Sequence, residues 1–395
     1  MRIAGVVAEY NPFHNGHALH VARTRAAGCD HVVAVMSGAF TQRGEPALCD
    51  KWARARMALA GGIDLVVELP ALFAVRPAPQ FALGGVTLLN ALGADVLSFG
   101  CETDNLALLS TMAALLESEP QELKAAIRAR LAGGQSHARA RGGALAEYLS
   151  MPPERVAAPN TALALEYLRV NNRFKQPMRP LSVQRVGDYH DQQLREIASA
   201  SAVRRALRAE GPAAIRGSVP PATFEALAAA WPDALPRPEA LDELLLYRLR
   251  GMDAERLRAL PDVAEGLEMR ILSNAREATS REGLTDLVKC KRYTRARIAR
   301  ALTYALLDLT RALAAQYENG APYARVLGFR RDAKPLLKTL SERAAIPLIT
   351  DPVRLKGDPC FELERRATDL WGLTTRAPAL RKADRDLTER MVVVD

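Results

Sequence analysis

The chain has few aromatic residues, 5% of its 395, and few cysteines for its length. The five cysteines are scattered and form no CxxC pair: Cys29, Cys49, Cys101, Cys290 and Cys360. This pattern argues against a zinc site or a disulfide framework and is typical of reduced thiols, so we expect a cytoplasmic protein. No group of acidic side chains has the spacing of a metal site, so no protein-bound metal is predicted.

Long apolar runs are missing as well. No run reaches the length of a membrane span, and the first apolar segment meets Glu9 too early to be a signal peptide. We therefore predict no membrane association, and no segment indicates a protein partner. Hydrophobic residues make up 49% and charged residues 25%, which is ordinary for a globular protein.

Basic residues outnumber acidic ones by 54 to 45, which gives a formal net charge of +9. This excess permits a polyanionic partner such as nucleic acid, because Lys and Arg that meet phosphates release counterions. The alternative is an arginine-rich composition with solvated basic faces. Charge alone does not separate the two.

Short apolar runs alternate with helical patterns over the first hundred residues. The expected strands cover 3–8, 31–38, 63–70 and 96–100, and the expected helices cover 15–28, 50–61 and 79–92. Asn11 or Asn15 can cap the first of these helices and Asp50 the second. The alternation predicts an α/β fold with a Rossmann-like parallel sheet and helices on both faces. Ligands of such sheets bind beyond the carboxyl ends of the strands.

The rest of the chain has mainly helical patterns, apart from one further strand expected at 181–186. A segment rich in proline and alanine, 211–238, is the best candidate for a domain boundary. We therefore predict an α/β catalytic domain at 1–210 and a mainly helical domain at 211–395.

The turn after the first strand, NPFHNGH, combines histidine and glycine at the start of a helix. Three of the six histidines lie here, at His14, His17 and His20. Imidazoles three residues apart point the same way and can hold the oxygens of a departing pyrophosphate. Gly16 lets a flat base approach the backbone, and a helix N-terminus attracts phosphate. The alternative is a chance cluster of histidines; the strand, motif and helix together favour nucleotide binding.

A second phosphate-binding element is expected in the segment SASAVR. The hydroxyls of Ser199 and Ser201 lie at a helix start, and Arg204 follows in the next turn. Hydroxyls, backbone N–H groups and a guanidinium together can bind phosphate. A capped surface helix is the alternative for this segment taken alone.

These two motifs resemble those of a known superfamily. NPFHNGH is similar to the HxGH motif of HIGH-type nucleotidyltransferases, and SASAVR to a degenerate form of their ISSTxIR motif. The resemblance is closer to one family, the bacterial tRNA(Met) cytidine acetate ligases. It rests on the ordered segments VAEYNPFHNGH, MSGAFTQRGEPALCDKWARARMAL, DLVVELP, LSFGCE, PNTALALEYL, VQRVGDYHD, IASASAVR, EGLEMRI, KCKRYTRARIAR and RVLGF.

The resemblance implies a reaction in two steps. ATP, with Mg²⁺, and acetate give acetyl-adenylate and pyrophosphate. The acetyl group then passes to the exocyclic amine of the wobble cytidine in elongator tRNA(Met), and the product is N4-acetylcytidine. His14 and His17 are the implied catalytic residues.

The resemblance also implies the ATP-binding residues. They are Val7, Ala8, Glu9, Tyr10, Asn11, Pro12, Phe13, His14, Asn15, Gly16, His17, Ala18, Leu19 and His20, together with Gly100, Asn160 and Arg185. Chemically, an amide can read a ribose or a base, and an arginine can meet phosphate. The alternatives are a helix cap for Asn160 and a surface charge for Arg185.

The chain departs from the family pattern at two places. Cys101 stands where the family commonly has serine, and the block 73–82 differs from the usual Gln-Ser-Ala-Glu run. Gly100 and the strand expected at 96–100 are retained, so we expect ATP binding to change little. The altered block leaves acetate selection open.

Three charged residues near the first turns have open roles. Arg43 and Lys51 can neutralise ATP phosphates or steer acetate, and the alternative for Lys51 is a solvated lysine in a first helical turn. Glu9 can position a water bound to Mg²⁺, and packing or capping is the alternative.

The segment 289–300 carries six basic residues in twelve and no acidic one. We interpret Lys289, Lys291, Arg292 and Arg295 as contacts to tRNA phosphates, with Tyr293 as a stacking platform. Read as a helix, the segment places its basic residues on one face. A solvated helix face is the alternative.

Three functions remain open at this point. The leading one is the acetate ligase. The runner-up is a small-metabolite adenylyltransferase, which the first motif alone does not distinguish. The third is a non-catalytic RNA-binding protein, against which the intact His14 and His17 argue.

Overall fold

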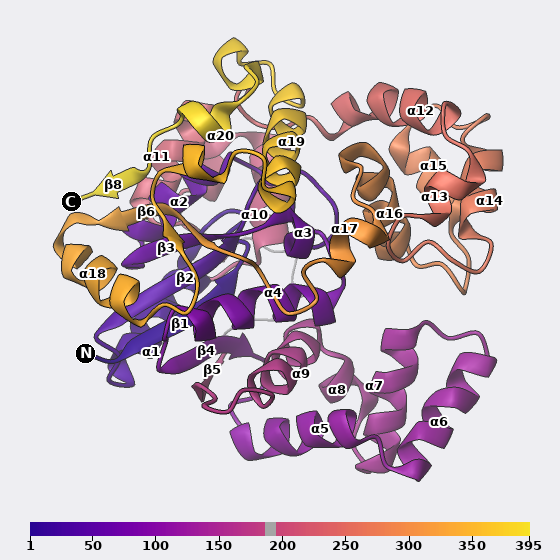
Figure 1. Ribbon diagram of the computed structural model, residues 1–395, viewed down its shortest axis with the longest axis horizontal. Helices are drawn as coiled ribbons and strands as arrows, with labels where there is room; N and C mark the ends of the chain where they lie inside the picture. The colour runs from indigo at the N-terminus through magenta and orange to yellow at the C-terminus, as the bar shows by residue number, and fades with distance from the viewer. Residues whose placement is uncertain (186–194) are drawn as a thin grey trace.

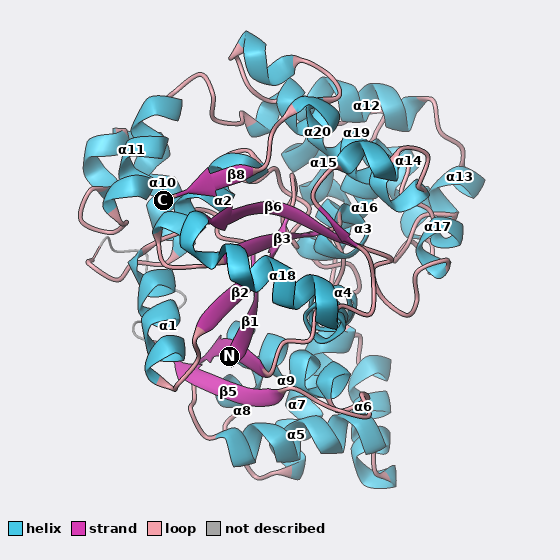
Figure 2. Cartoon of the chain, turned by 60° about the vertical axis from the view of Figure 1, so that its left-hand side comes forward, coloured by secondary structure: helices cyan, strands magenta, loops and turns pink. Residues whose placement is uncertain are grey.

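Short β-branched and apolar runs form the strands of one central sheet (Figures 1 and 2). The computed structural model describes residues 1–185 and 195–395, so the second half of the VQRVGDYHD segment lies outside the described residues. The described strands are β1 Ile3–Ala8, β2 His31–Ser37, β3 Leu65–Leu69, β4 Val96–Cys101, β5 Arg179–Gln184, β6 Ala324–Arg330, β7 Leu348–Ile349 and β8 Val392–Val394.

The strand order is β5-β4-β1-β2-β3-β6-β7, with β8 beside β6. Strands β1 to β5 are parallel to one another, and β6 lies antiparallel to its neighbour β3. The chain runs outward from β1 to β3 on one side and from β4 to β5 on the other. The order therefore reverses between β1 and β4, and ligands of open parallel sheets bind at such a reversal point. The expected α/β class is confirmed.

The helices of the first part are α1 Asn15–Ala26, α2 Lys51–Ala60, α3 Ala71–Ala74, α4 Ala78–Ala91, α5 Leu106–Ser118, α6 Gln121–Ala132, α7 His137–Tyr148, α8 Pro153–Ala157 and α9 Pro159–Asn171. Those of the second part are α10 Ala200–Glu210, α11 Pro221–Ala230, α12 Asp242–Arg250, α13 Ala254–Arg258, α14 Leu267–Asn274, α15 Arg281–Val288, α16 Arg295–Leu307, α17 Arg311–Ala315, α18 Lys334–Arg343, α19 Pro359–Leu373 and α20 Arg385–Thr388. Short 3₁₀ helices are η1 Pro212–Ile215, η2 Pro238–Leu241, η3 Arg331–Ala333, η4 Pro352–Leu355 and η5 Pro378–Arg381. Within the described ranges, no helix is both long and apolar enough to span a membrane.

Side chains of β2 alternate between two hydrophobic cores. Val33 and Val35 belong to the core under α4 and α9, whereas Ala34 and Met36 belong to the core under α2, α10 and α11. Successive residues of a strand point to opposite faces, so a strand that is apolar throughout must be covered on both sides. Helices accordingly lie on both faces of the sheet, as expected.

Most expected elements are present with small shifts. Asp50 caps α2 by accepting a hydrogen bond from the N–H of Ala53, as predicted. The strand expected at 181–186 begins two residues earlier, because Arg179 pairs in register with Val96 of β4. Tertiary pairing, which no local pattern shows, sets that boundary.

The segment 211–238 is not an exposed linker. Its residues Ile215 and Leu227 are fully buried in the same core as Met36 of β2. The mainly helical second part also contributes three strands, β6 to β8, to the same sheet. The division into domains at residue 211 stays a prediction, and the structure adds that the two parts share a sheet and a core.

Two helical lobes lie at one end of the molecule, α5 to α8 and α12 to α17, while both termini lie at the other end (Figure 1). The second lobe contacts the loop that follows β2. The Gly44 carbonyl accepts hydrogen bonds from Arg281 Nη2 and from Thr303 Oγ1, both at 2.6 Å. Residues of α15 and α16 thus hold this loop by its backbone.

Five charged side chains are buried together between β3, β6 and the C-terminal helices, each at most 4% exposed: Lys51, Glu68, Arg325, Glu364 and Asp386. Lys51 Nζ lies 2.5 Å from Glu68 Oε1 and 3.2 Å from Glu364 Oε1. It also lies 2.6 Å from Asp386 Oδ1. Both sequence-based interpretations of Lys51, as a phosphate ligand and as a solvated lysine, are therefore wrong.

Three carboxyl groups share two cations in this cluster, so charge balance requires one proton. Burial and the neighbouring Glu68 raise the pKa of Glu364 from 4.5 to about 8. The folded state therefore keeps a proton that the unfolded chain releases above pH 4.5. It follows that this carboxyl lowers the free energy of unfolding as the pH rises from 4.5 towards 8.

We predict that Lys51→Met lowers the free energy of unfolding by about 3–5 kcal/mol, because it leaves buried carboxylates short of a cation. The loss should grow with pH, since more carboxyl groups then have to be charged. Urea unfolding at pH 5.5 and pH 8 measures it. Glu364→Gln should remove the decrease in stability between those two pH values.

Lys338→Met is the matched control, because Lys338 is exposed and pairs only loosely with Glu342 at 4.0 Å. Its effect should stay within about 0.5 kcal/mol. An effect of Lys51→Met as small as that of Lys338→Met would contradict the buried charge cluster as a source of stability.

Candidate active site

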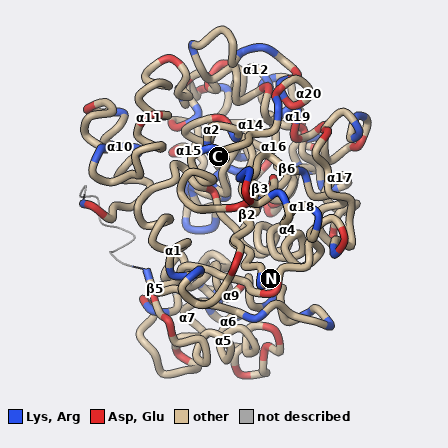
Figure 3. Tube along the Cα trace, turned by 90° about the vertical axis from the view of Figure 1, so that its left-hand side faces the viewer, with Lys and Arg blue, Asp and Glu red and all other residues tan. Residues whose placement is uncertain are grey.

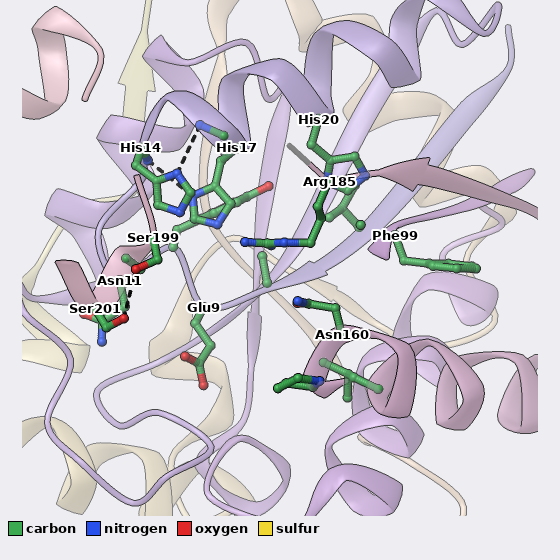
Figure 4. A pocket seen from close by; sticks show the side chains of 18 of the residues that line it. Glu9, Asn11, His14, His17, His20, Phe99, Asn160, Arg185, Ser199 and Ser201 are labelled. Atoms are coloured by element: carbon green, nitrogen blue, oxygen red, sulfur yellow. Dashed lines mark hydrogen bonds between the residues drawn. The ribbon is translucent and has the colours of Figure 1, made fainter. Parts of the chain in front are cut away.

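A cavity of about 860 Å³ opens at the carboxyl ends of β1, β4 and β5. Its walls come from the segments 6–20 and 41–45, from the ends of β4, α9 and β5, and from the start of α10. The site lies where the strand order reverses, as the parallel-sheet pattern predicts. Figure 4 shows the side chains that point into it.

His14 and His17 close the N-terminus of α1 in a reciprocal cap. His14 Nδ1 accepts from the N–H of Gly16 at 3.1 Å, and His17 Nδ1 accepts from the N–H of His14 at 3.2 Å. The cap expected at Asn11 or Asn15 is thus supplied by His14. The two rings stack with their centroids 3.7 Å apart, so they do point the same way.

This cap determines which nitrogen of each ring carries a proton. A neutral imidazole has one donor and one acceptor nitrogen, and in both rings Nδ1 already accepts. The proton must therefore lie on Nε2, and each ring presents an Nε2–H donor at the cavity. Burial and then the positive charges of Arg185 and Arg204 lower the pKa of His14 to about 3. Burial, and then the neighbouring His14 ring and Arg185, also hold the pKa of His17 well below its ordinary value.

Gly16 lines the cavity and also has a structural role beside His14. A Cβ atom there would lie 2.9 Å from His14 Cε1, so glycine makes room for the capping ring itself. His20 lines the cavity, but its Nε2 is hydrogen-bonded to Ser98 Oγ at 2.9 Å. His14 and His17 are therefore the two histidines of this cluster whose Nε2 atoms remain available to a ligand.

The predicted stretch from Val7 to His20 lines the cavity except at four residues. Phe13 is fully buried against Gly61, and Pro12 is buried beside it. Asn15 donates to the carbonyls of Glu196 and Gly217, which anchors α1 to the segment before α10 and to the segment after η1. The fourth residue that does not line the cavity is Ala18.

The second expected element meets the first in the cavity. Ser199 caps α10 by accepting from the N–H of Ala202, and its Oγ lies 3.0 Å from that of Ser201. Arg204, one turn on, donates to the carbonyl of Asn11 at 2.7 Å. Residues 199–201 and 204 all line the cavity, so two helix N-termini converge there.

Gly100, Asn160 and Arg185 also line the cavity. Asn160 Nδ2 donates to Glu102 Oε1 at 2.7 Å, and the N–H and hydroxyl of Thr161 donate to Oε2 at 2.7 and 2.8 Å. Burial opposes ionisation of Glu102, but these bonds outweigh it and hold its pKa below the ordinary value. Glu102, not Asn160, thus caps α9, and its carboxylate fixes the side chain of Asn160.

Cys101 points away from the cavity. Its thiol is fully buried and lies 3.4 Å from Thr161 Oγ1. The altered block 73–82 contributes Phe81 to the cavity wall. Of these two departures from the family pattern, the block with Phe81 is therefore the one that reaches the cavity.

Arg54 was missed by the sequence reasoning. Its guanidinium is fully buried and donates to the carbonyls of Glu9 at 2.7 Å and Ser37 at 3.0 Å, and also to that of Gly38. It also donates through Nε to the carbonyl of Cys49 at 3.1 Å. The sequence signal that could have revealed it is its place on the apolar face of the predicted helix 50–61, where an arginine needs buried hydrogen-bond acceptors.

The basic segment 289–300 is only partly helical. Helix α16 begins at Arg295, so Lys291 and Arg292 do not share a helical face with it. Tyr293 is 6% exposed and its hydroxyl bonds the carbonyl of Glu265, so it is no stacking platform. Arg295 pairs with Glu282 and Asp286.

Besides Arg295, which is exposed but paired, three cations of this segment are exposed: Lys289, Lys291 and Arg292. None of these three forms an ion pair within the part of the chain that the structure describes. Elsewhere both signs of charge are spread over the whole trace (Figure 3). The net charge is therefore not gathered on one face, and the loop 289–292 is a local concentration of free cations.

The family model of HIGH nucleotidyl transferases matches residues 1–386. The tRNA(Met) cytidine acetate ligase of Syntrophomonas wolfei is 38% identical over 98% of both chains, and that of Acetivibrio thermocellus is 34% identical over 100% of both. The crystal structure of Thermotoga maritima TmcAL bound with alpha-thio ATP covers 100% of both chains, with 31% identity and a TM-score of 0.90.

The chain belongs to the tRNA(Met) cytidine acetate ligase family. This confirms the resemblance stated from the sequence motifs. In this ligase family member, two helix N-termini converge at the cavity, which Arg185 and Arg204 also line.

We predict that His14 and His17 stay neutral throughout pH 5–8, because burial and the nearby arginines oppose a further positive charge. The ring carbon signals of ¹³C-labelled histidine in NMR titrations should not shift in this range. The signal that is missing from the spectrum of His17→Ala identifies the ring of His17. A midpoint near the ordinary value of 6.5 for either ring would show that the cavity does not suppress protonation.

Proposed function

We propose that this chain is an ATP-dependent ligase. It forms acetyl-adenylate from acetate and ATP and passes the acetyl group to the wobble cytidine of elongator tRNA(Met), which gives N4-acetylcytidine. The observation that carries the proposal is the stacked pair of neutral imidazole donors, held at a helix N-terminus in a chain that matches these ligases over its full length.

The cavity residues account for the first step. The Nε2–H groups of His14 and His17 donate to oxygens of the departing pyrophosphate, where negative charge builds up. Because both rings are neutral and already fixed by their caps, they need no reorganisation during the reaction. Arg185 and Arg204 add positive charge, and the N-terminus of α10 adds free N–H groups for phosphate.

Mg²⁺ would enter with ATP. Among the described residues no group of three metal-ligating side chains is present, which fits an ion held mainly by the nucleotide phosphates. Such an ion neutralises phosphate charge when it is bound. The cavity side chains orient the phosphates around it.

The exposed cations of the loop 289–292 are the best-supported contact for tRNA phosphates. The loop connects α15 and α16, which also hold the cavity loop at Gly44. A cytoplasmic location, where the tRNA would be met, stays a prediction from the five cysteines, all of which are free thiols.

The alternative is an adenylyltransferase for a small phosphorylated metabolite. One experiment separates the two functions. The protein is incubated with labelled acetate, ATP and bulk tRNA. Label in tRNA, found in N4-acetylcytidine after nuclease digestion, supports the ligase. Formation of an AMP adduct only with a phosphorylated metabolite supports the alternative.

We predict that His17→Asn lowers acetate-dependent ATP–pyrophosphate exchange at least about 100-fold, the usual cost of losing a donor to developing charge. Asparagine keeps an acceptor in the place of Nδ1, so the cap of α1 should survive. The free energy of unfolding should therefore fall by less than about 1 kcal/mol. An active His17→Asn protein would exclude the mechanism proposed for the imidazole pair.

We also predict that Lys291→Glu with Arg292→Glu weakens tRNA binding about 10-fold or more at low salt and reduces the salt dependence of the affinity. Pyrophosphate exchange should stay unchanged. The charge-matched control is Arg354→Glu with Lys356→Glu. Arg354 lies in η4 and Lys356 directly after it, and both side chains are exposed. Equal weakening by both double variants would indicate that only net charge matters.

A further inference from the structure

Glu9 lies at the carboxyl end of β1 and its backbone and side chain are both fixed. Arg54 donates to its carbonyl at 2.7 Å. The N–H of Gln42 donates to its Oε1 at 2.7 Å. The carboxylate therefore has a defined orientation before any ligand binds.

The second oxygen of this carboxylate is left for a ligand. Oε2 accepts no hydrogen bond from any residue within 1–185 or 195–395, and Glu9 is half-buried in the cavity wall. Figure 4 shows the side chain of Glu9 extending away from the imidazoles of His14 and His17, and its Oε1 meets the loop 41–45. The cavity thus has a side of N–H donors and a side with a carboxylate acceptor.

A carboxylate is a poor neighbour for the two anionic substrates. It repels the phosphates of ATP and the carboxylate of acetate, and it attracts an N–H donor. Phe81, Leu163 and Tyr167 line the same cavity and offer apolar surface to a flat ring. The carboxylate side therefore suits an uncharged heterocycle that carries an amino group.

We propose that Glu9 takes the proton of the acceptor amine in the transfer step, an inference that rests on the proposed function. The amine nitrogen attacks the carbonyl carbon of acetyl-adenylate, and a C–N bond forms. The bond between that carbon and the phosphate oxygen breaks, and AMP leaves with the electron pair. One proton of the amine moves to Glu9 Oε2. Atoms and charge balance without a further reactant.

This proton transfer meets a chemical need. The lone pair of a cytosine amine is delocalised into the ring, so the amine is a weak nucleophile and its adduct must lose a proton to give a neutral amide. A base in fixed position contributes about 10²- to 10⁴-fold to such a step. The neutral His14 and His17 do not serve here, because their Nε2 atoms already carry protons and their Nδ1 atoms accept from the backbone.

The test separates the two half-reactions in Glu9→Gln. The amide oxygen can still accept from Gln42, so the wall should keep its shape. Acetate-dependent pyrophosphate exchange reports any effect of Glu9 on the ATP site, and its loss should be much smaller than the loss of transfer. Acetyl transfer to tRNA in a single turnover should fall at least about 100-fold.

Two further variants make the result specific. Glu9→Asp keeps a base at a shorter reach and should retain part of the transfer rate. Glu122→Gln, at an exposed position of α6, should leave both half-reactions unchanged. If Glu9→Gln does not fold, the ratio of transfer to exchange in Glu9→Asp tests the inference instead, and a ratio equal to that of the wild type overturns it.

Three outcomes overturn the inference. Transfer at the normal rate by Glu9→Gln removes the role of Glu9 and leaves the proposed function intact. Equal loss of exchange and transfer, with an altered requirement for Mg²⁺, assigns Glu9 to the first step instead. A wild-type protein that exchanges pyrophosphate and acetylates no tRNA overturns the proposed function, and the role of Glu9 with it.

Discussion

The buried guanidinium of Arg54 is the contact on which the cavity depends. It satisfies the carbonyls at the ends of β1 and β2 and in the loop that follows β2. A buried carbonyl without a hydrogen-bond partner costs about 1–3 kcal/mol. The backbone at the ends of β1 and β2 therefore needs a donor such as Arg54 where it turns away from the sheet. Because the first turn and the loop 41–45 both start from these ends, one side chain determines where His14, His17 and Glu9 stand.

Much of the fold follows from local sequence, for reasons that particular residues make clear. The run from His31 to Ser37 is apolar throughout, and such a run needs cover on both faces, which only a sandwich of helices around a parallel sheet provides. The motif NPFHNGH placed two imidazoles at a helix start, and their spacing alone predicts that they share a direction. The family and its fold followed from the order of the motifs.

The errors came from contacts between distant segments. Lys51 looks like an ordinary first-turn lysine because its partners Glu364 and Asp386 lie more than 300 residues away. Tyr293 looks available for stacking because the carbonyl of Glu265 that binds its hydroxyl is not visible locally. Similarly, Asn11 and Asn15 are the residues that normally cap a helix, whereas the stacked rings of His14 and His17 do so here.

The carbonyl of Gly44 joins the lobe α12 to α17 to the loop that follows β2, which lines the cavity. The loop 289–292 lies between the helices α15 and α16 of a helical hairpin, and the same hairpin holds the cavity wall through hydrogen bonds from Arg281 and Thr303. Any tilt of the hairpin must therefore carry the wall with it or break buried hydrogen bonds. A ligand that displaced the hairpin would therefore act on the cavity wall as well, and thermodynamic coupling would make the effect reciprocal.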